Sequence, residues 1–308
     1  MANETYDTEE LAREIERLRG TQPHLKNLLD AFGPLLLEKN RWLSETAVDP
    51  QIMPVDPRRL AEGIPLNRQY PLFRPEDPWG SAGWSVAKAI ARGFPRLGQD
   101  MDVLLRQFTE GKYESFALLF AHTGDNTEDN TENYTEEADG QLAGRAAELG
   151  ISPVSLHLFL RFLNRFMLAK KARDMTTELA AHVWKKGYCP VCGSFPHLAV
   201  IEEQGQRRLK CADCGHAWPF ARLACPYCDH EDPRSSNIFF IDGKPEDLAY
   251  TCDKCRGYLL TANRSAGLGR PPADLIAMSL THLDVILQEK GYSPMVECEW
   301  NSFGVSED

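Results

Sequence analysis

The sequence predicts a multidomain α+β protein, with an N-terminal multihelical domain, two tandem four-cysteine ribbon domains and a C-terminal helix. Apolar residues recur at helical spacing through much of the first 186 residues. All nine cysteines lie beyond that point, among short strand-like runs. The 308 residues suffice for two or three domains with apolar cores. The predicted boundaries are 1–186, 187–222, 223–262 and 263–308.

The predicted N-terminal domain opens with an amphipathic helix. Thr8 is its expected N-terminal cap, and Leu11, Ile15 and Leu18 form one apolar face. The clearest helix begins at Ser152-Pro153, where serine suits the cap and proline suits the first turn. Its wide apolar face is expected to form the centre of the domain. Other helical patterns cover residues 25–36, 82–94, 99–108, 113–121 and 176–184.

Two segments of this domain lack a helical pattern. Residues 47–80 contain seven prolines, which predicts an extended connector wrapped over the helices. Residues 124–139 contain seven acidic residues and no basic one, too little apolar surface to offset the entropy of ordering. We interpret this segment as a flexible insertion, with an acidic cation-binding loop as the alternative.

Four Cys-x-x-Cys motifs dominate the region that follows. Two intervening residues allow a tight turn to point both thiolates at one ion, and two such turns complete a tetrahedral shell. Gly193 and Gly215 directly follow the second cysteine of their motifs and permit a positive φ there. A disulfide framework is the alternative, but an N-terminus without an apolar signal segment favours metal ligands. Cys298 stands alone, as a buried or partly exposed small residue.

The spacing of the motifs predicts a sequential pairing. The gaps are 18 residues after the first motif, 10 after the second and 23 after the third. Each long gap holds two strand-like runs that suit a hairpin, at 197–201 with 207–210 and at 237–241 with 248–251. An interleaved pairing is the main alternative. The predicted ligands are Cys189, Cys192, Cys211 and Cys214 for the first ion, and Cys225, Cys228, Cys252 and Cys255 for the second.

Aromatic residues follow the returning motifs. Trp218, Phe220 and Tyr258 are expected to pack against the small metal cores. His182 and His216 lie near the motifs, and we interpret them as packing or hydrogen-bonding residues. A C-terminal helix is predicted at 272–290, ended by Gly291.

Shells of four sulfurs leave no open position at which a metal could activate water. A structural role for the ions is the main interpretation, and a redox or regulatory iron is the alternative because four thiolates also suit iron. The sequence shows no Gly-rich dinucleotide fingerprint and no catalytic triad pattern, so no enzyme activity is predicted.

The composition also bears on partners. A formal net charge of −11 argues against nucleic acid and anionic membranes as partners of the whole molecule. No apolar run approaches the roughly 18 residues that cross a bilayer, so a cytoplasmic protein without membrane insertion is predicted. A nucleic-acid-binding zinc ribbon remains an alternative because of six basic residues, Lys185, Lys186, Arg207, Arg208, Lys210 and Arg222.

Several motifs together resemble one known family. They are YCPVCGSFP at 188–196, LKCADCGHAW at 209–218, CPYC at 225–228 and TCDKCRGYL at 251–259. A helix with Asp274 and Asp284 follows, then a tail with Gly291-Tyr292 and the run NSFG at 301–304. This order resembles the formate dehydrogenase accessory protein family, FdhE, closely over 187–304 and only loosely over 1–186. The acidic insertion departs from the family pattern.

The resemblance implies a multihelical domain followed by two rubredoxin-like domains, with the eight paired cysteines as metal ligands and iron favoured as the metal. It implies a cytoplasmic assembly factor that binds the catalytic subunit of a respiratory formate dehydrogenase before export. An iron-containing redox carrier is a further alternative. Because the 152–184 helices meet the first ribbon without a linker, a rigid cleft at that seam is the predicted partner-binding surface.

Overall fold

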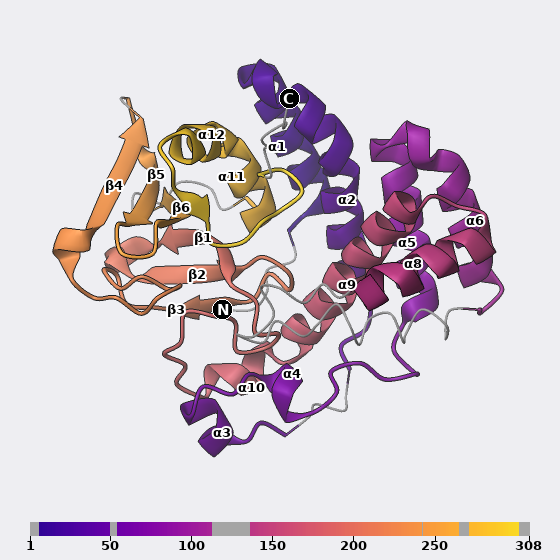
Figure 1. Ribbon diagram of the computed structural model, residues 1–308, viewed down its shortest axis with the longest axis horizontal. Helices are drawn as coiled ribbons and strands as arrows, with labels where there is room; N and C mark the ends of the chain where they lie inside the picture. Colours follow the sequence, from indigo (N-terminus) through magenta and orange to yellow (C-terminus); the bar gives the residue numbers. More distant parts are fainter. Residues whose placement is uncertain (1–5, 50–53, 113–135, 242, 265–270, 302–308) are drawn as a thin grey trace.

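The computed structural model describes residues 6–49, 54–112, 136–241, 243–264 and 271–301. Most helices gather on one side of the molecule and the strands on the other, with α9 running between them (Figure 1). The longer helices are α1 (Thr8–Thr21), α2 (Lys26–Glu45), α5 (Trp79–Gly93), α6 (Gly98–Thr109), α8 (Glu136–Leu149) and α9 (Pro153–Asp174). The short ones are α3 (Pro57–Ala61), α4 (Leu66–Gln69) and α10 (Thr176–Ala180), with single turns η1 (Pro23–Leu25), η2 (Pro95–Leu97), η3 (Glu203–Gly205) and η4 (Pro233–Ser235).

The N-terminal helices pack through the apolar faces that their spacing predicts. Leu11, Ile15 and Leu18 of α1 are buried in one cluster with residues of α2, α5, α6 and α9. The cap of α1 differs from the prediction: the carboxylate of Asp7, one residue earlier than Thr8, accepts a hydrogen bond from the Glu10 N–H at 2.8 Å. The Thr8 hydroxyl instead accepts a bond from the Asn40 side chain.

Helix α9 is the element that both halves of the molecule share. It begins at Pro153 as predicted, although Ser152 makes no side-chain cap bond. Its N-terminal part packs in the helical cluster, while Leu168 and Ala172 pack with the cysteines of the first motif.

No single helix among the described residues is long and apolar enough to cross a membrane. One pair of consecutive helices, Gly140–Leu149 and Pro153–Asp174, reaches the required length and apolar composition when the two are taken together, but the pair is bent by 105°.

Two predicted segments differ from expectation. The connector 47–80 is not wholly extended, because it contains α3 and α4 and its end starts α5. The last four residues of the acidic insertion belong to α8, whereas 124–135 and the whole helical pattern at 113–121 lie outside the described residues.

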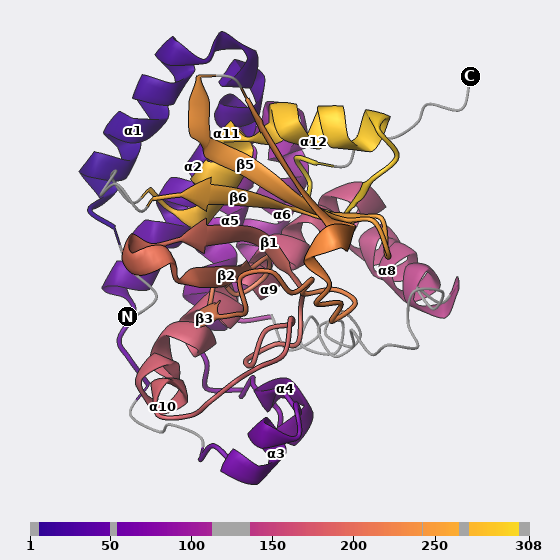
Figure 2. The ribbon, with the colours of Figure 1, turned by 90° about the vertical axis from the view of Figure 1, so that its left-hand side faces the viewer.

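The strands form one seven-stranded sheet, in which β5, β6, β1, β2 and β3 follow one another from top to bottom in Figure 2. The order is β3-β2-β1-β6-β5-β4, with β7 also paired to β6. The only parallel pairs on this described sheet are β1 with β6 and β6 with β7. The strands are β1 (Pro196–Ile201), β2 (Arg207–Cys211), β3 (Ala217–Pro219), β4 (Ser236–Ile241), β5 (Lys244–Cys252), β6 (Gly257–Asn263) and β7 (Ser293–Pro294).

The fold is thus a mixed helical and sheet structure, as predicted, but two separate tandem rubredoxin-like domains are not confirmed. Each half of the cysteine region forms the expected hairpin, and β1 and β6 then join the halves edge to edge, with Leu198 opposite Leu260. The domain boundaries stay a prediction.

The predicted C-terminal helix is two helices, α11 (Ala273–Ser279) and α12 (Thr281–Glu289). It breaks near Leu280, where the hydroxyls of Ser279 and Thr281 bond to backbone carbonyls.

Helices α11 and α12 cover one face of the sheet. Leu198, Tyr258 and Leu260 of the strands pack there with Ile276 and Leu283 of the helices. The opposite face, at β1 and β2, carries the cluster that contains the cysteines and the end of α9. The sheet is therefore the middle layer between the C-terminal helices and the first four-cysteine site.

Candidate metal centres

The first four cysteines converge on one point. The Sγ atoms of Cys189 and Cys214 are 3.5 Å apart, those of Cys192 and Cys211 are 3.4 Å apart, and all four lie within 4.8 Å of one another. Sulfurs at 2.3 Å from a common tetrahedral ion would be about 3.8 Å apart. The geometry and the donor set fit a metal ion that favours thiolates.

The other four cysteines make the same arrangement. The Sγ atoms of Cys225 and Cys255 are 3.7 Å apart and those of Cys228 and Cys252 are 3.8 Å apart, again with all four within 4.8 Å. The structure therefore groups the thiols in the sequential pairing and not in the interleaved one. We refer to the two groups as the first and second centres. Both could hold a metal ion.

Local turns aim the sulfurs. In the first motif the Gly193 N–H donates to the carbonyl of Cys189 at 3.0 Å, and the Cys189 N–H donates to the carbonyl of Ser194 at 2.9 Å. The N–H of Val191 points at the Cys189 sulfur, 3.4 Å away. Such N–H groups stabilise thiolate charge, so the turn prepares the sulfur for a cation.

The residue after the second cysteine has a positive φ in all four motifs. Gly193 has φ 78° and Gly215 has φ 69°, as predicted for glycine. Asp229 and Arg256 occupy the equivalent places in the second centre with φ values of 53° and 58°. The sequence did not predict a positive φ at these two residues because neither is glycine. Only their position after the second cysteine of a motif could have indicated it.

Burial distinguishes the two centres. All four sulfur-bearing residues of the first centre are buried, and Cys192, the most exposed, retains only 5% of its surface. In the second centre Cys225 and Cys252 are buried, while Cys228 and Cys255 are half-buried. The side chain beside Cys228 is Tyr227, which is 46% exposed.

Protons compete with a metal for these thiols. Burial raises the pKa of Cys255 to about 11 and holds the pKa of Cys211 and Cys214 well above the usual value. A bound metal requires thiolates, so binding releases protons and weakens as the pH falls.

A chain of polar contacts joins the first centre to α9. The Ser194 hydroxyl lies 3.5 Å from the Cys192 sulfur and donates to the Asp213 carboxylate at 2.6 Å. Asp213 faces the buried Arg165 at 3.5 Å, and Arg165 also pairs with Glu299 at 2.6 Å. Burial disfavours the charge of Arg165, but the two carboxylates raise its pKa above the ordinary value. The only sequence signal for Arg165 was that it interrupts an apolar run.

The seam between α9 and the first ribbon is packed, which differs from the cleft expected there. A cavity of about 20 Å³ remains, lined by residues that include Arg165, Ala212 and Trp300. That volume has room for about one water molecule. The physical reason is that the tail 295–301 returns to this seam, placing Cys298 and Trp300 in the helical core.

The aromatic residues follow the prediction only in part. Trp218 and Phe220 pack against the cluster that contains the first-centre cysteines, and His216 stacks on Trp218 at 6.4 Å. Tyr258 lies on the opposite face under α12 because side chains alternate along β6. Its hydroxyl donates to Asp284 at 2.6 Å.

The other acidic residue of the C-terminal motif, Asp274, fixes α11 to the rest of the fold. It pairs with Lys39 of α2 and lies 3.3 Å from the His197 Nε2 of β1. Burial opposes its charge, but Lys39 and His197 lower the pKa of Asp274 well below its usual value. Asp274 therefore acts as a structural anchor between α2, β1 and α11.

The basic residues near the first ribbon do not form a phosphate-binding stripe as a set. Arg207 is buried, and its guanidinium donates to the carbonyls of Ala221, Arg222 and Ala224. Burial lowers the pKa of Arg207 to about 10. Arg208 bonds to the carbonyl of Ala217 at 2.7 Å. Two of the six candidates for phosphate contacts are thus committed to backbone carbonyls.

The fold and the two thiol clusters define a class: a helical protein joined to a sheet that presents two four-cysteine metal centres. No family model matches the chain. Over 126 residues it is 32% identical to an FdhE homolog of Aquifex aeolicus. That match covers 39% of this chain and 43% of the relative. It is 29% identical over 115 residues to the FdhE protein of Escherichia coli O127:H6, covering 35% and 36%. The matches thus span less than half of either relative.

A solved structure agrees along nearly the whole chain. The crystal structure of the FdhE protein from Pseudomonas aeruginosa matches with a TM-score of 0.53 and 21% identity over 94% of both chains. At that identity the match shows a shared fold. Together with the sequence matches it confirms the predicted resemblance to the FdhE proteins.

Proposed function

We propose that the chain is an accessory factor for formate dehydrogenase that holds two metal ions and binds the enzyme's catalytic subunit in the cytoplasm before export. The observation that supports this most is the pair of four-thiol centres in a chain that resembles FdhE proteins. Centres closed by four sulfurs suit folding and recognition better than catalysis. The proposal is therefore of a binding protein without turnover of its own.

In this proposal Cys189, Cys192, Cys211 and Cys214 ligate the first ion, and Cys225, Cys228, Cys252 and Cys255 the second. Zinc and iron both suit four thiolates. The metal would supply the cross-link that fixes four turns of the chain, and turn N–H groups such as that of Val191 would stabilise the negative sulfur shell.

The partner test uses the purified protein and the catalytic subunit of its host's formate dehydrogenase, mixed anaerobically at micromolar concentration. Size exclusion should show co-elution, and metal analysis of the same fractions should give two ions per chain. Cys298→Ser serves as a control, because Cys298 belongs to neither centre. The substitution should leave partner binding and metal content unchanged. Absence of co-elution, with normal formate dehydrogenase activity in a deletion strain, would refute the proposal.

One observation favours a second candidate, an iron-containing redox carrier. Cys228 and Cys255 are half-buried, so an electron donor could approach the second centre closely. The visible spectrum of anaerobically prepared protein separates the candidates. Iron in four thiolates absorbs visible light and bleaches on reduction, whereas zinc is colourless and has no redox chemistry.

A further inference from the structure

The proline-rich segment 54–78, which we name the strap, covers the first centre. Its helix α4 lies on the first motif: the Leu66 N–H donates to the carbonyl of Pro190 at 2.8 Å, and the Asn67 N–H donates to the carbonyl of Val191 at 3.0 Å. The Asn67 side-chain amide donates to the carbonyl of Cys192, also at 3.0 Å. Three hydrogen bonds thus attach the strap to the turn that carries two sulfurs.

Apolar packing completes this cover. The strap residues Val55, Leu60, Leu66 and Leu72 lie in a buried cluster that contains all four first-centre cysteines and the two buried cysteines of the second centre, Cys225 and Cys252. The hydroxyl of Tyr188, next to the first motif, donates to the carbonyl of Gly63 at 2.6 Å. The four cysteines are buried, so solvent can reach their sulfurs only if local packing, of which the strap is a part, opens.

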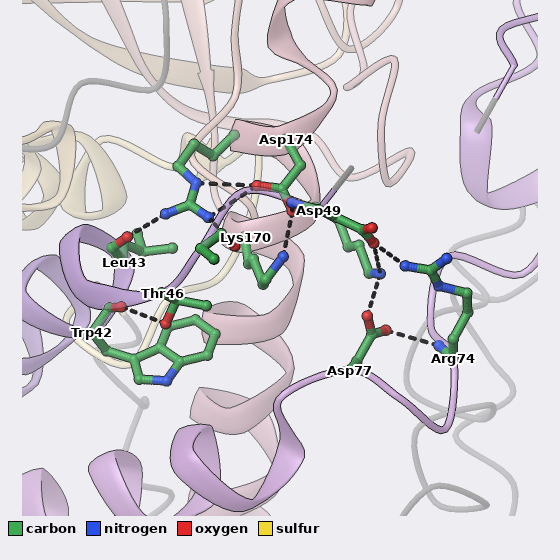
Figure 3. Close-up of polar contacts among 11 residues, drawn as sticks. Trp42, Leu43, Thr46, Asp49, Arg74, Asp77, Lys170 and Asp174 are labelled. Atoms are coloured by element: carbon green, nitrogen blue, oxygen red, sulfur yellow. Dashed lines mark hydrogen bonds and ion pairs between the residues drawn. The ribbon is translucent and has the colours of Figure 1, made fainter. Parts of the chain in front are cut away.

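Buried ion pairs hold the C-terminal end of the strap on α9 (Figure 3). Lys171 donates to Asp77 at 2.5 Å, and the other carboxylate oxygen of Asp77 accepts from the Arg74 N–H at 2.8 Å. Arg74 also pairs with Asp49, which donates its own N–H to Asp174 of α9. The strap is therefore anchored by α9 and not only by the centre that it covers.

The second centre is open by comparison. Its outer thiols, Cys228 and Cys255, are half-buried, and the neighbouring Leu223 and Tyr227 are 48% and 46% exposed. An incoming ligand or proton can reach a half-exposed thiolate directly, whereas a fully buried one requires local opening of the structure first.

We infer that the strap seals the first centre and leaves the second as the exchangeable metal site, from which an ion passes to a competing ligand first. This rests on the proposed binding of metal by both centres. The ion in the first centre is then a permanent part of the structure, while the metal bound in the second centre depends on which metal is supplied. The charge and composition of the competing ligand in the cell are not needed for this distinction.

The test begins with protein loaded anaerobically with zinc and exposed to excess chelator. One equivalent should leave in a fast phase and one in a slow phase. The rates should differ by about tenfold or more, because only release from the first centre requires local opening. Pulse alkylation with N-ethylmaleimide and peptide mass spectrometry should label Cys228 and Cys255 before Cys189 and Cys214. This second readout assigns each phase to a centre.

Variants connect the slow phase to the strap. Asn67→Ala removes the hydrogen bond to Cys192 and should accelerate the slow phase about fivefold, as expected for one net hydrogen bond. Asn237→Ala is the matched control, because it removes a 2.9 Å hydrogen bond to Asp253 beside the second centre and should leave the slow phase unchanged. Circular dichroism checks that both variants are folded.

The outcomes separate this inference from the proposed function. Zinc well below two ions per chain at the start would contradict the metal-binding proposal and the inference with it. Two ions that leave at one rate, first labelling of Cys189 and Cys214, or a slow phase that ignores Asn67→Ala would overturn the inference alone.

Discussion

Asp284 is a carboxyl group buried between α12 and the sheet. One of its oxygens accepts from Tyr258 at 2.6 Å, and the other has no hydrogen-bond partner among the described residues. Burial raises the pKa of Asp284 to about 7, although the bond from Tyr258 lowers it in part. The protonated form is therefore favoured in the folded protein below pH ~7.

This shift predicts a pH dependence of stability. Because the folded pKa exceeds the unfolded value of about 3.9, the folded state binds more protons between these values, and stability falls as the pH rises. The contribution is complete below pH ~4 and is lost through pH ~7, an effect of about 2–4 kcal/mol.

Asp284→Asn tests this effect, because the amide cannot ionise. In urea denaturation the stability advantage of the variant over the parent should be larger at pH 8.5 than at pH 5.5 by about 2 kcal/mol. Metal content should be measured at both values, since protons also compete for the thiols. An equal difference at the two pH values would show that Asp284 does not titrate in this range.

Gly187 marks a close approach between the two centres. A Cβ atom at this position would lie 1.8 Å from the carbonyl oxygen of Pro226, in the third motif. Gly187→Ala should destabilise the protein by about 1–3 kcal/mol, because backbone cannot yield as a flexible side chain does. Thermal unfolding measures the change.

The matched control is Gly144→Ala in α8, where a Cβ would meet nothing within 4 Å. Alanine there should be neutral or stabilise the helix by up to about 1 kcal/mol. Equal effects of the two substitutions would mean that the contact with Pro226 is unimportant.

At this scale the sequence was informative where a residue type has one strong use. It predicted the cysteines that converge and the positive φ of Gly193 and Gly215. It could not predict Arg165 or the bond from Asn67, because each depends on a partner more than 45 residues away. Aspartate and arginine at positive φ, as at Asp229 and Arg256, follow from the surrounding turn and not from their own preference.

Among the elements, the strap and α9 are joined by charges that are almost fully buried. Lys171 and Asp77 retain 4% and 2% of their side-chain surface. Burial lowers the pKa of Lys171, although its bond to Asp77 opposes that change. Asp77→Ala should therefore destabilise the protein by about 3 kcal/mol, since it removes the closer carboxylate of a buried cation and leaves only Asp49, 3.9 Å away.

A double variant distinguishes the ion pair from simple packing. Lys171→Met with Asp77→Leu replaces both charges by apolar side chains and should recover most of the stability that Asp77→Ala loses. Urea denaturation of the parent, both single variants and the double variant gives the coupling energy. Additive effects of the two single substitutions would contradict a direct interaction.

The sequence predicted elements where hydrophobic periodicity is local. The apolar faces of α1, α2, α5, α6 and α9 and both ribbon hairpins correspond to the patterns. It did not predict the pairing of β1 with β6, because a parallel contact between strands far apart in sequence leaves no local signal. The division of the C-terminal helix was also missed, since Leu280 fits an apolar pattern and only the neighbouring hydroxyls disfavour continuity.

For the whole molecule, the clusters cross the predicted boundary at residue 186. Leu168 and Met175 share a core with the first-centre cysteines, and Leu275 and Trp300 share one with the N-terminal helices. Structures that share a core unfold together. We therefore expect a single thermal transition for the metal-loaded chain, followed in parallel by far-ultraviolet circular dichroism and tryptophan fluorescence.

Cys189→Ser gives this expectation a sharper form. Loss of one first-centre ligand should lower the midpoint of the single transition for both probes, because α9 packs directly on that centre. Two separated transitions would instead support an independent helical domain with its boundary near 186.

The pairing of β1 with β6 also constrains how the chain is made. During synthesis β1 and the rest of the first ribbon are made well before β6, which begins 56 residues after β1 ends. Until then one edge of β1 has no strand to pair with, and an open edge invites pairing with other chains. Synthesis of the last motif completes the second centre, and synthesis of β6 directly after it closes that edge. A nascent chain halted before residue 257 is therefore the species most in need of a chaperone.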